Sequence, residues 1–201
     1  MTTATHVSLA VAPPAPRKRV GYWGMVLLCL SEAALFAYLI SSYFYLGVSN
    51  RAWPPVGDEP PSLEKPLVMT ALLVSSSIVL LFAGKARERG SKKLYLAGSA
   101  GTMLLGLAFL VVQATEFREL WRKMPPSSHA YASMFYAITG FHGTHVAAGL
   151  LVLAWTWVAD ARGRLVERSS LAVTNAALYW HFVDAVWLVI LTSLYLSPRW
   201  Y

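Results

Sequence analysis

The sequence predicts an all-α integral membrane protein, a bundle of five transmembrane helices. Of its 201 residues, 56% are hydrophobic and 13% are charged, and a soluble domain carries about twice that charged fraction. Five apolar segments are each about long enough for a helix that crosses a hydrocarbon core of about 30 Å. Their unbroken apolar character favours helices over barrel strands, which alternate. The composition excludes an ordinary soluble enzyme, a disordered chain and a nucleic-acid-binding domain.

The first predicted span covers residues 21–46 and follows a tail, residues 1–20, that is rich in Ala, Pro and Thr and predicted to be disordered. The other spans cover residues 67–84, 94–114, 131–158 and 174–196. The second is short and the fourth is long, which indicates tilted or interfacial helix ends. Residues 21–201 are therefore predicted to form a single five-helix membrane domain.

Basic residues in the connectors predict the orientation. The net charge of +7 comes from short clusters between the apolar runs. Of the 17 Lys and Arg residues, 11 lie before the first span or in the second and fourth connectors, and the other six lie on the opposite side. Because cytoplasmic loops carry an excess of Lys and Arg, the N-terminus is predicted in the cytoplasm and the C-terminus outside.

Ionisable side chains inside the spans are the candidate functional residues, because each costs at least about 2.5–3.5 kcal/mol at the centre of a membrane helix. They are Glu32, Glu116, His142, His145, His181 and Asp184. His142 and His145 share one helix face, as do His181 and Asp184. We expect the two faces to point at each other, with Glu32 near one of them. The helical rise places His145 and His181 at one level and Glu32, His142 and Asp184 at another.

The residues alone leave four interpretations of this cluster open. Three imidazoles suit a metal or haem site, and a carboxylate–histidine chain suits proton or ion transport. A polar face also suits docking of a partner subunit, and a hydrogen-bonded cluster that only fixes helix packing needs no chemistry. Cys29 is the one cysteine, so this chain alone has neither an intrachain disulfide nor the thiolate set of a copper or iron–sulfur centre.

Five sequence stretches carry a resemblance to a known family. They are residues 30–32 (LSE) with Leu35 and Phe36, residues 53–55 (WPP), residues 113–117 (QATEF), residues 139–146 (TGFHGTHV) and residues 179–187 (YWHFVDAVW). In order and spacing, residues 23–196 resemble subunit III of the haem–copper respiratory oxidases, in the five-helix form found in bacteria.

The resemblance implies a non-redox accessory subunit of a cytochrome c or quinol oxidase in the bacterial inner membrane. Such an oxidase reduces dioxygen to water, pumps protons and serves aerobic respiration and the electron transport chain. Haem and copper belong to partner subunits I and II, and this chain is expected to hold no metal and no catalytic residue. Glu32, Glu116, His142, His145, His181 and Asp184 are then expected to form a buried polar network for assembly.

The resemblance also implies bound phospholipid and support of proton uptake and catalytic lifetime. We expect acyl chains in a groove lined by the first two helices. The expected head-group contacts are Trp53 on the outside and Lys85, Arg87, Arg89, Lys92 and Lys93 on the inside. Two alternatives remain: an accessory membrane protein of a nitric oxide reductase, and a free-standing transporter that uses the carboxylate–histidine cluster.

Overall fold

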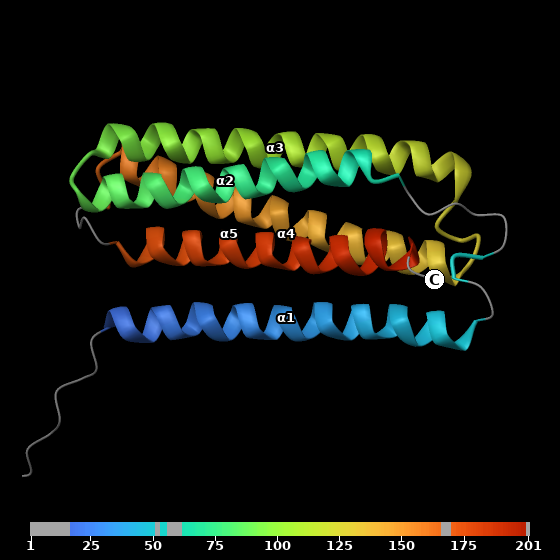
Figure 1. Ribbon diagram of the computed structural model, residues 1–201. Helices are drawn as coiled ribbons and strands as arrows, with labels where there is room; N and C mark the ends of the chain where they lie inside the picture. The colour runs from blue at the N-terminus through green and yellow to red at the C-terminus, as the bar shows by residue number, and fades with distance from the viewer. Residues whose placement is uncertain (1–16, 51–52, 56–61, 166–169, 200–201) are drawn as a thin grey trace, which may run out of the picture.

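A computed structural model describes residues 17–50, 53–55, 62–165 and 170–199, and all regular structure in this part of the chain is helical (Figure 1). The helices are α1 (Arg17–Ser49), α2 (Glu64–Glu88), α3 (Lys92–Lys123), α4 (Ala130–Ala161) and α5 (Leu171–Ile190). A π-helical segment, η1 (Leu191–Leu196), and a 3-10 turn, η2 (Ser197–Arg199), continue α5. Five helices are long and apolar enough to cross a membrane, which confirms the predicted fold class.

The helices extend beyond the apolar runs that predicted them. The first begins at Arg17 rather than at residue 21, so residues 17–20 of the expected tail are helical, while residues 1–16 lie outside the described part. The third continues past residue 114 to Lys123. Hydrophobicity indicates only the part of a helix that hydrocarbon surrounds, whereas backbone hydrogen bonding continues into the polar ends.

Two helices end on glycine at the same end of the bundle. Gly90 follows α2 with a φ of 89°, and Gly163 follows α4 with a φ of 69°. The amide of Ser91 donates to the carbonyl of Ala86 and that of Arg164 to the carbonyl of Ala159, each over 2.9 Å. This left-handed ending suits glycine, which lacks a β-carbon, and it fixes where α2 and α4 stop.

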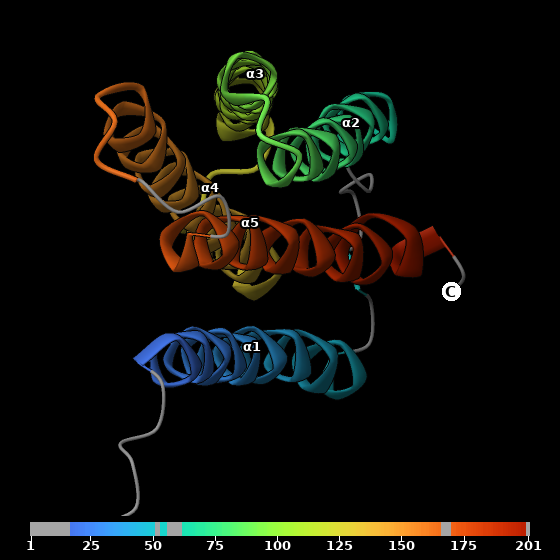
Figure 2. The same cartoon turned by 90° about the vertical axis from the view of Figure 1, so that its left-hand side faces the viewer.

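The arrangement of the helices places α5 at the centre. Seen from the end in Figure 2, α5 lies between α1 and the α2–α3 pair, with α4 beside it. It is the most buried of the five helices, and α1 is the least buried. The first helix packs on α4 and α5 through Cys29, Phe36 and Tyr43, which recur every seven residues and are buried.

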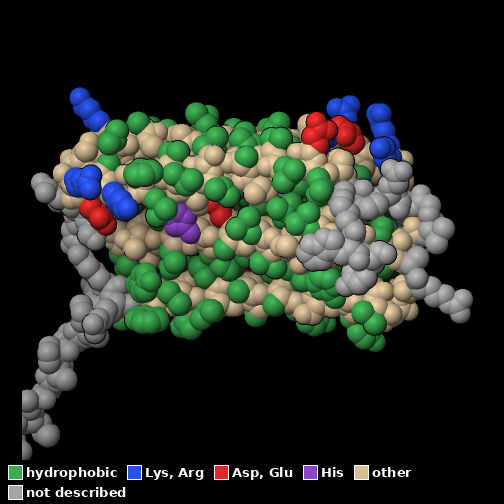
Figure 3. All heavy atoms as spheres, in the orientation of Figure 1, with side chains coloured by type: hydrophobic (Ala, Val, Ile, Leu, Met, Phe, Trp, Pro, Cys, Tyr) green, Lys and Arg blue, Asp and Glu red, His purple; other side chains and the backbone are tan. Residues whose placement is uncertain are grey.

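The surface of the bundle is apolar along its length and charged at its ends. On the face drawn in Figure 3, hydrophobic side chains are spread across the middle while most Lys, Arg, Asp and Glu side chains gather at both ends. Large exposed apolar residues occur on every helix, among them Leu27, Ile78, Leu104, Leu151 and Val189. Such a surface is costly in water and suits a bilayer.

Candidate functional site

Glu32 and His145 form a contact between α1 and α4. The Oε2 atom of Glu32 lies 2.9 Å from Nε2 of His145, and Nδ1 of His145 lies 2.7 Å from the carbonyl oxygen of Phe141. A carbonyl only accepts, so Nδ1 donates to it. A hydrogen bond at Nε2 then requires one proton shared between that nitrogen and the carboxyl group, on either partner. The contact is therefore a hydrogen bond that holds one proton and joins α1 to α4.

The hydroxyl of Ser77 on α2 forms hydrogen bonds with both His181 and Asp184 of α5. Its Oγ lies 2.8 Å from Nδ1 of His181 and donates to Oδ2 of Asp184. Because the hydroxyl gives its one hydrogen to Asp184, the bond from His181 is donated by Nδ1. Nε2 of His181 and Oδ1 of Asp184 are buried and have no hydrogen-bond partner in the described residues. Figure 3 shows a histidine and an acidic side chain within the apolar band of one face.

His142 occupies an aromatic enclosure. It is fully buried, and its ring centroid lies 5.2 Å from that of Trp187, 5.7 Å from that of Phe109 and 6.3 Å from that of Phe36. Neither ring nitrogen has a hydrogen-bond partner among the residues that the structure describes. His142 therefore meets α5 through its ring, but the polar side chains of α4 and α5 do not bond to each other as expected: His145 bonds to α1, and His181 and Asp184 bond to α2.

The expected levels are also corrected. Glu32 and His145 share a level, although the apolar runs placed them about one turn apart. Glu32 lies 15 residues after the start of α1, and His145 lies 16 residues before the end of α4. Depths counted from these helix ends agree, since each residue adds about 1.5 Å. The error came from the predicted ends of the spans.

Glu116 takes part in a separate contact, toward the end of the bundle that is opposite to Gly90 and Gly163. Its carboxyl group is buried and accepts a hydrogen bond of 3.1 Å from the hydroxyl of Tyr195 in η1. One turn away on the same helix, Glu119 pairs with Lys65 of α2 over 2.5 Å. The six candidate residues therefore do not form one network but lie in four separate places.

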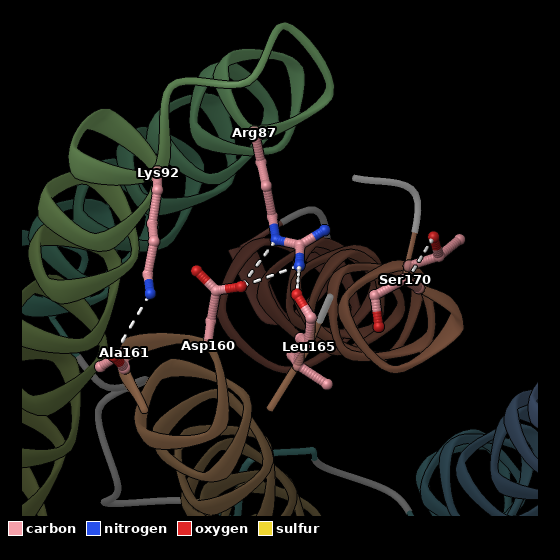
Figure 4. Close-up of polar contacts among 7 residues, drawn as sticks. Arg87, Lys92, Asp160, Ala161, Leu165 and Ser170 are labelled. Carbon is pink, nitrogen blue, oxygen red and sulfur yellow. Dashed lines mark hydrogen bonds and ion pairs between the residues drawn. The ribbon is translucent and has the colours of Figure 1, made fainter. Parts of the chain in front are cut away.

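A buried ion pair that the sequence did not indicate joins Arg87 to Asp160 (Figure 4). Nε and Nη2 of Arg87 lie 3.1 and 2.8 Å from Oδ1 of Asp160, and Nη2 donates to the carbonyl of Leu165 over 3.0 Å. The two residues are 6% and 3% exposed. Asp160 stands two and four residues before Arg162 and Arg164, and a carboxylate at the end of a span beside these basic residues was the available signal.

This pair corrects one of the lipid candidates. Arg87 was expected to contact lipid head groups, but its guanidinium is buried and bound to Asp160. Lys92 donates to the carbonyl of Ala161 over 3.3 Å. Lys85, Arg89 and Lys93 are exposed. Three of the five inner candidates thus keep an exposed cationic side chain that makes no hydrogen bond within the described residues.

Trp53 lines a groove, but not the one expected. Its ring packs against Tyr43 and Tyr131, with centroids 5.3 and 5.2 Å away. With Tyr43, Val48 and Pro198 it borders a groove of about 280 Å³ between the end of α1 and the C-terminal segment. The expected groove between the first two helices is absent from the described part, because α5 lies between α1 and α2.

The arrangement offers hydrogen bonding and one shared proton rather than a metal site. Within the described ranges, no three His, Cys, Asp or Glu side chains come together in a way that could hold a metal ion. His142, His145 and His181, which the first of the four interpretations grouped as ligands, contact different partners. The contacts Glu32–His145, Ser77 with His181 and Asp184, and Glu116–Tyr195 each join two elements of the bundle.

Comparison with known proteins assigns the family. The family model for cytochrome c oxidase subunit III matches residues 16–199. The chain is similar to cytochrome c oxidase subunit 3 of Synechocystis sp., 38% identical over 176 residues, which is 87% of this chain and 74% of the relative. It is also similar to the subunits of Thermostichus vulcanus (34% identical, 88% and 87% covered) and Equus caballus (32% identical, 86% and 68% covered).

Proposed function

The chain belongs to the cytochrome c oxidase subunit III family, and we propose that within the oxidase it acts as a scaffold that holds no redox centre of its own. The family makes it an accessory subunit of a terminal oxidase, an oxidoreductase complex, and a multi-pass membrane protein. The relatives named above are all cytochrome c oxidase subunits, which favours this function over a nitric oxide reductase accessory protein or a transporter.

The proposed partners are the catalytic subunit I and subunit II, which supply haem and copper. The chain packs beside subunit I in the bacterial inner membrane with residues 21–201 as its membrane domain. The basic end, with Arg87, Arg89, Lys92 and Lys93, faces the cytoplasm. The distribution of 11 and six basic residues between the two sides supports this orientation.

One observation carries the structural role: three contacts between polar side chains join different helical elements of this chain. Glu32 pairs with His145 and Ser77 pairs with His181 and Asp184, and Glu116 pairs with Tyr195. Hydrogen bonds between membrane helices contribute about 0.6–2 kcal/mol each. We infer that these hydrogen bonds, together with the buried His142, stabilise the packing of the helices whose outer surface attaches to subunit I.

Lipid binding and support of proton uptake belong to the same proposal. Acyl chains lie against the groove beside Trp53, and head groups contact exposed cations at the basic end. Each cation near an anionic leaflet contributes about 1 kcal/mol. Bound lipid and the packing of this chain against subunit I together stabilise the active conformation of subunit I. In this way the chain supports proton uptake and lengthens the catalytic lifetime.

The test compares the oxidase with and without this chain. We expect equal haem and copper content per subunit I, equal haem spectra and a retained initial rate of oxygen reduction, with faster loss of activity during turnover in the depleted enzyme. Restoring the purified chain should restore the lifetime. Loss of a haem or copper in the depleted enzyme, after correction for subunit I, would show that the chain holds a redox centre.

A further inference from the structure

The C-terminal part of α3 extends past its membrane-spanning part. The apolar run ends at residue 114, and the helix continues without a break to Lys123. At about 1.5 Å per residue, Trp121 stands about 10 Å past the end of that run. The head-group region on each side of a bilayer is only about 5–7 Å thick. Trp121 therefore lies too far out for the aromatic belt at the membrane surface, and the tip of α3 faces the aqueous phase.

A basic face runs along this tip. Arg118, Arg122 and Lys123, with Thr115 and Glu119, line a groove of about 490 Å³. The three cations are exposed, and none of them forms a hydrogen bond or an ion pair with another described residue. Glu119, the one carboxylate of this lining, is paired with Lys65 over 2.5 Å. The α3 basic face, formed by these three cations, therefore carries a net positive charge.

The spacing of the two arginines is unfavourable without a partner. Arg118 and Arg122 lie four residues apart and so on one side of the helix, where like charges repel. Each guanidinium can form two parallel hydrogen bonds to a carboxylate. An acidic side chain bound beside them would remove the repulsion.

Trp121 adds an apolar anchor next to the arginines. It is 60% exposed, yet its ring packs against that of Tyr136 on α4, with the centroids 6.0 Å apart. The Tyr136 ring also packs against Phe117, whose centroid lies 5.1 Å away. The indole is therefore positioned before any partner binds, which lowers the entropic cost of binding. Trp and Arg are also the residues most enriched among those that dominate binding at protein interfaces.

These features favour a protein partner over other anions. A lipid head group would lie nearer the hydrocarbon than Trp121 and Arg122, which stand about 10 and 12 Å past the apolar run. A small soluble anion would pair with the arginines but leave the indole uncovered. An acidic polypeptide segment that also carries an apolar side chain can cover both.

We propose that the α3 basic face and Trp121 together form the docking site for an acidic extramembrane segment of another subunit of the oxidase. Carboxylates of that segment pair with Arg118 and Arg122, and an apolar side chain lies on the indole of Trp121. This inference rests on the proposed assembly of the chain in the oxidase. It adds a contact outside the membrane to the proposed packing beside subunit I.

The first test is a cross-link in the whole oxidase. A photoreactive benzoylphenylalanine in place of Lys123 leaves Arg118, Trp121 and Arg122 intact, and mass spectrometry maps the product after irradiation. We expect a cross-link to an acidic segment of another subunit outside the membrane. The site is overturned if the cross-links reach only lipid, reach residues 56–61 of this chain, which include Asp58 and Glu59, or do not form.

The second test measures how fast the oxidase releases this chain on dilution into detergent. The double variant Arg118→Gln, Arg122→Gln should release it about fivefold faster at low salt. The difference should shrink at high salt, because salt screens exposed ion pairs. Trp121→Ala should release it about tenfold faster at both salt concentrations.

The matched control is Arg162→Gln, Arg164→Gln, which removes two exposed cations at the opposite end of the bundle and should leave the release rate unchanged. Wild-type release rates in both test variants would overturn the docking site and leave the proposed function standing. A wild-type chain that does not co-purify with the haem-containing subunits would contradict the proposed function and, with it, this site.

Discussion

At the scale of single residues, the buried pair of Arg87 and Asp160 makes the sharpest energetic prediction. Asp160→Ala leaves a buried guanidinium without its carboxylate, which costs about 3–5 kcal/mol. The double variant Arg87→Met, Asp160→Leu removes both charges and should cost less than Asp160→Ala alone. Thermal unfolding of the purified subunit in detergent measures both.

Glu88→Ala serves as the control for this pair, because it removes an exposed carboxylate from the same end of the bundle. It should change stability by no more than about 0.5 kcal/mol. If the double variant is less stable than Asp160→Ala, then the charges stabilise the fold through contacts other than with each other.

Sequence reasoning identified polar residues more readily than their partners. Spacing showed that His181 and Asp184 share a face, but not that Ser77 of α2 meets them, because a hydroxyl is an ordinary residue in a membrane helix. Arg87 was grouped with Lys85 and Arg89, since a run of basic residues does not show which side chain turns inward. The contacts depend on which helices are neighbours, and that information is not in local spacing.

At the scale of elements, the glycine that ends α2 predicts a local cost. Gly90 has a φ of 89°, and an L-residue in a left-handed conformation costs about 1–2 kcal/mol. Gly90→Ala should therefore lower the unfolding temperature. Gly84→Ala, inside α2 where an added β-carbon meets nothing within 4 Å, should raise it or leave it unchanged. Equal losses in the two variants would contradict this account of the turn.

The helices themselves were largely predictable, and their ends were not. All five apolar runs became helices because a backbone in hydrocarbon must satisfy its hydrogen bonds internally. The ends were set by other signals. Gly90 and Gly163 stop α2 and α4, while α3 runs to Lys123 through charged residues that no hydrophobicity argument includes.

At the scale of the whole molecule, orientation is open to direct test. Ser62 and Ser91 are exposed before α2 and after it, so they flank one proposed span. In cells, a cysteine at position 62 should react with an impermeant thiol reagent from outside, and a cysteine at position 91 only after the membrane is opened. The reverse pattern would invert the proposed topology. Cys29, which is buried, is replaced by Ala to remove background labelling.

The arrangement of helices was the least predictable feature of the molecule. The sequence suggested that the polar faces of α4 and α5 meet, whereas α5 lies at the centre and turns its polar face to α2. Five helices with several apolar faces can pack in many orders. Trp180 and Trp187 are both fully buried on α5, but their positions in the sequence do not indicate which helices bury them.

The central claim is that the polar contacts of this chain hold structure and perform no chemistry, and Asp184 tests it most directly. Asp184→Leu removes the acceptor of Ser77, at a cost of about 1–3 kcal/mol for an unpaired neutral group. Asp184→Asn keeps an acceptor there but not an ionisable group, so it separates hydrogen bonding from proton chemistry.

The measurement is the subunit content, the initial rate of oxygen reduction and the decay of activity during turnover in oxidase carrying each variant. The account predicts less bound subunit and faster decay for Asp184→Leu, an unchanged initial rate per intact complex, and near wild-type behaviour for Asp184→Asn. A subunit that stays bound in both variants while the initial rate collapses in both would contradict it and assign a chemical role to the carboxyl group.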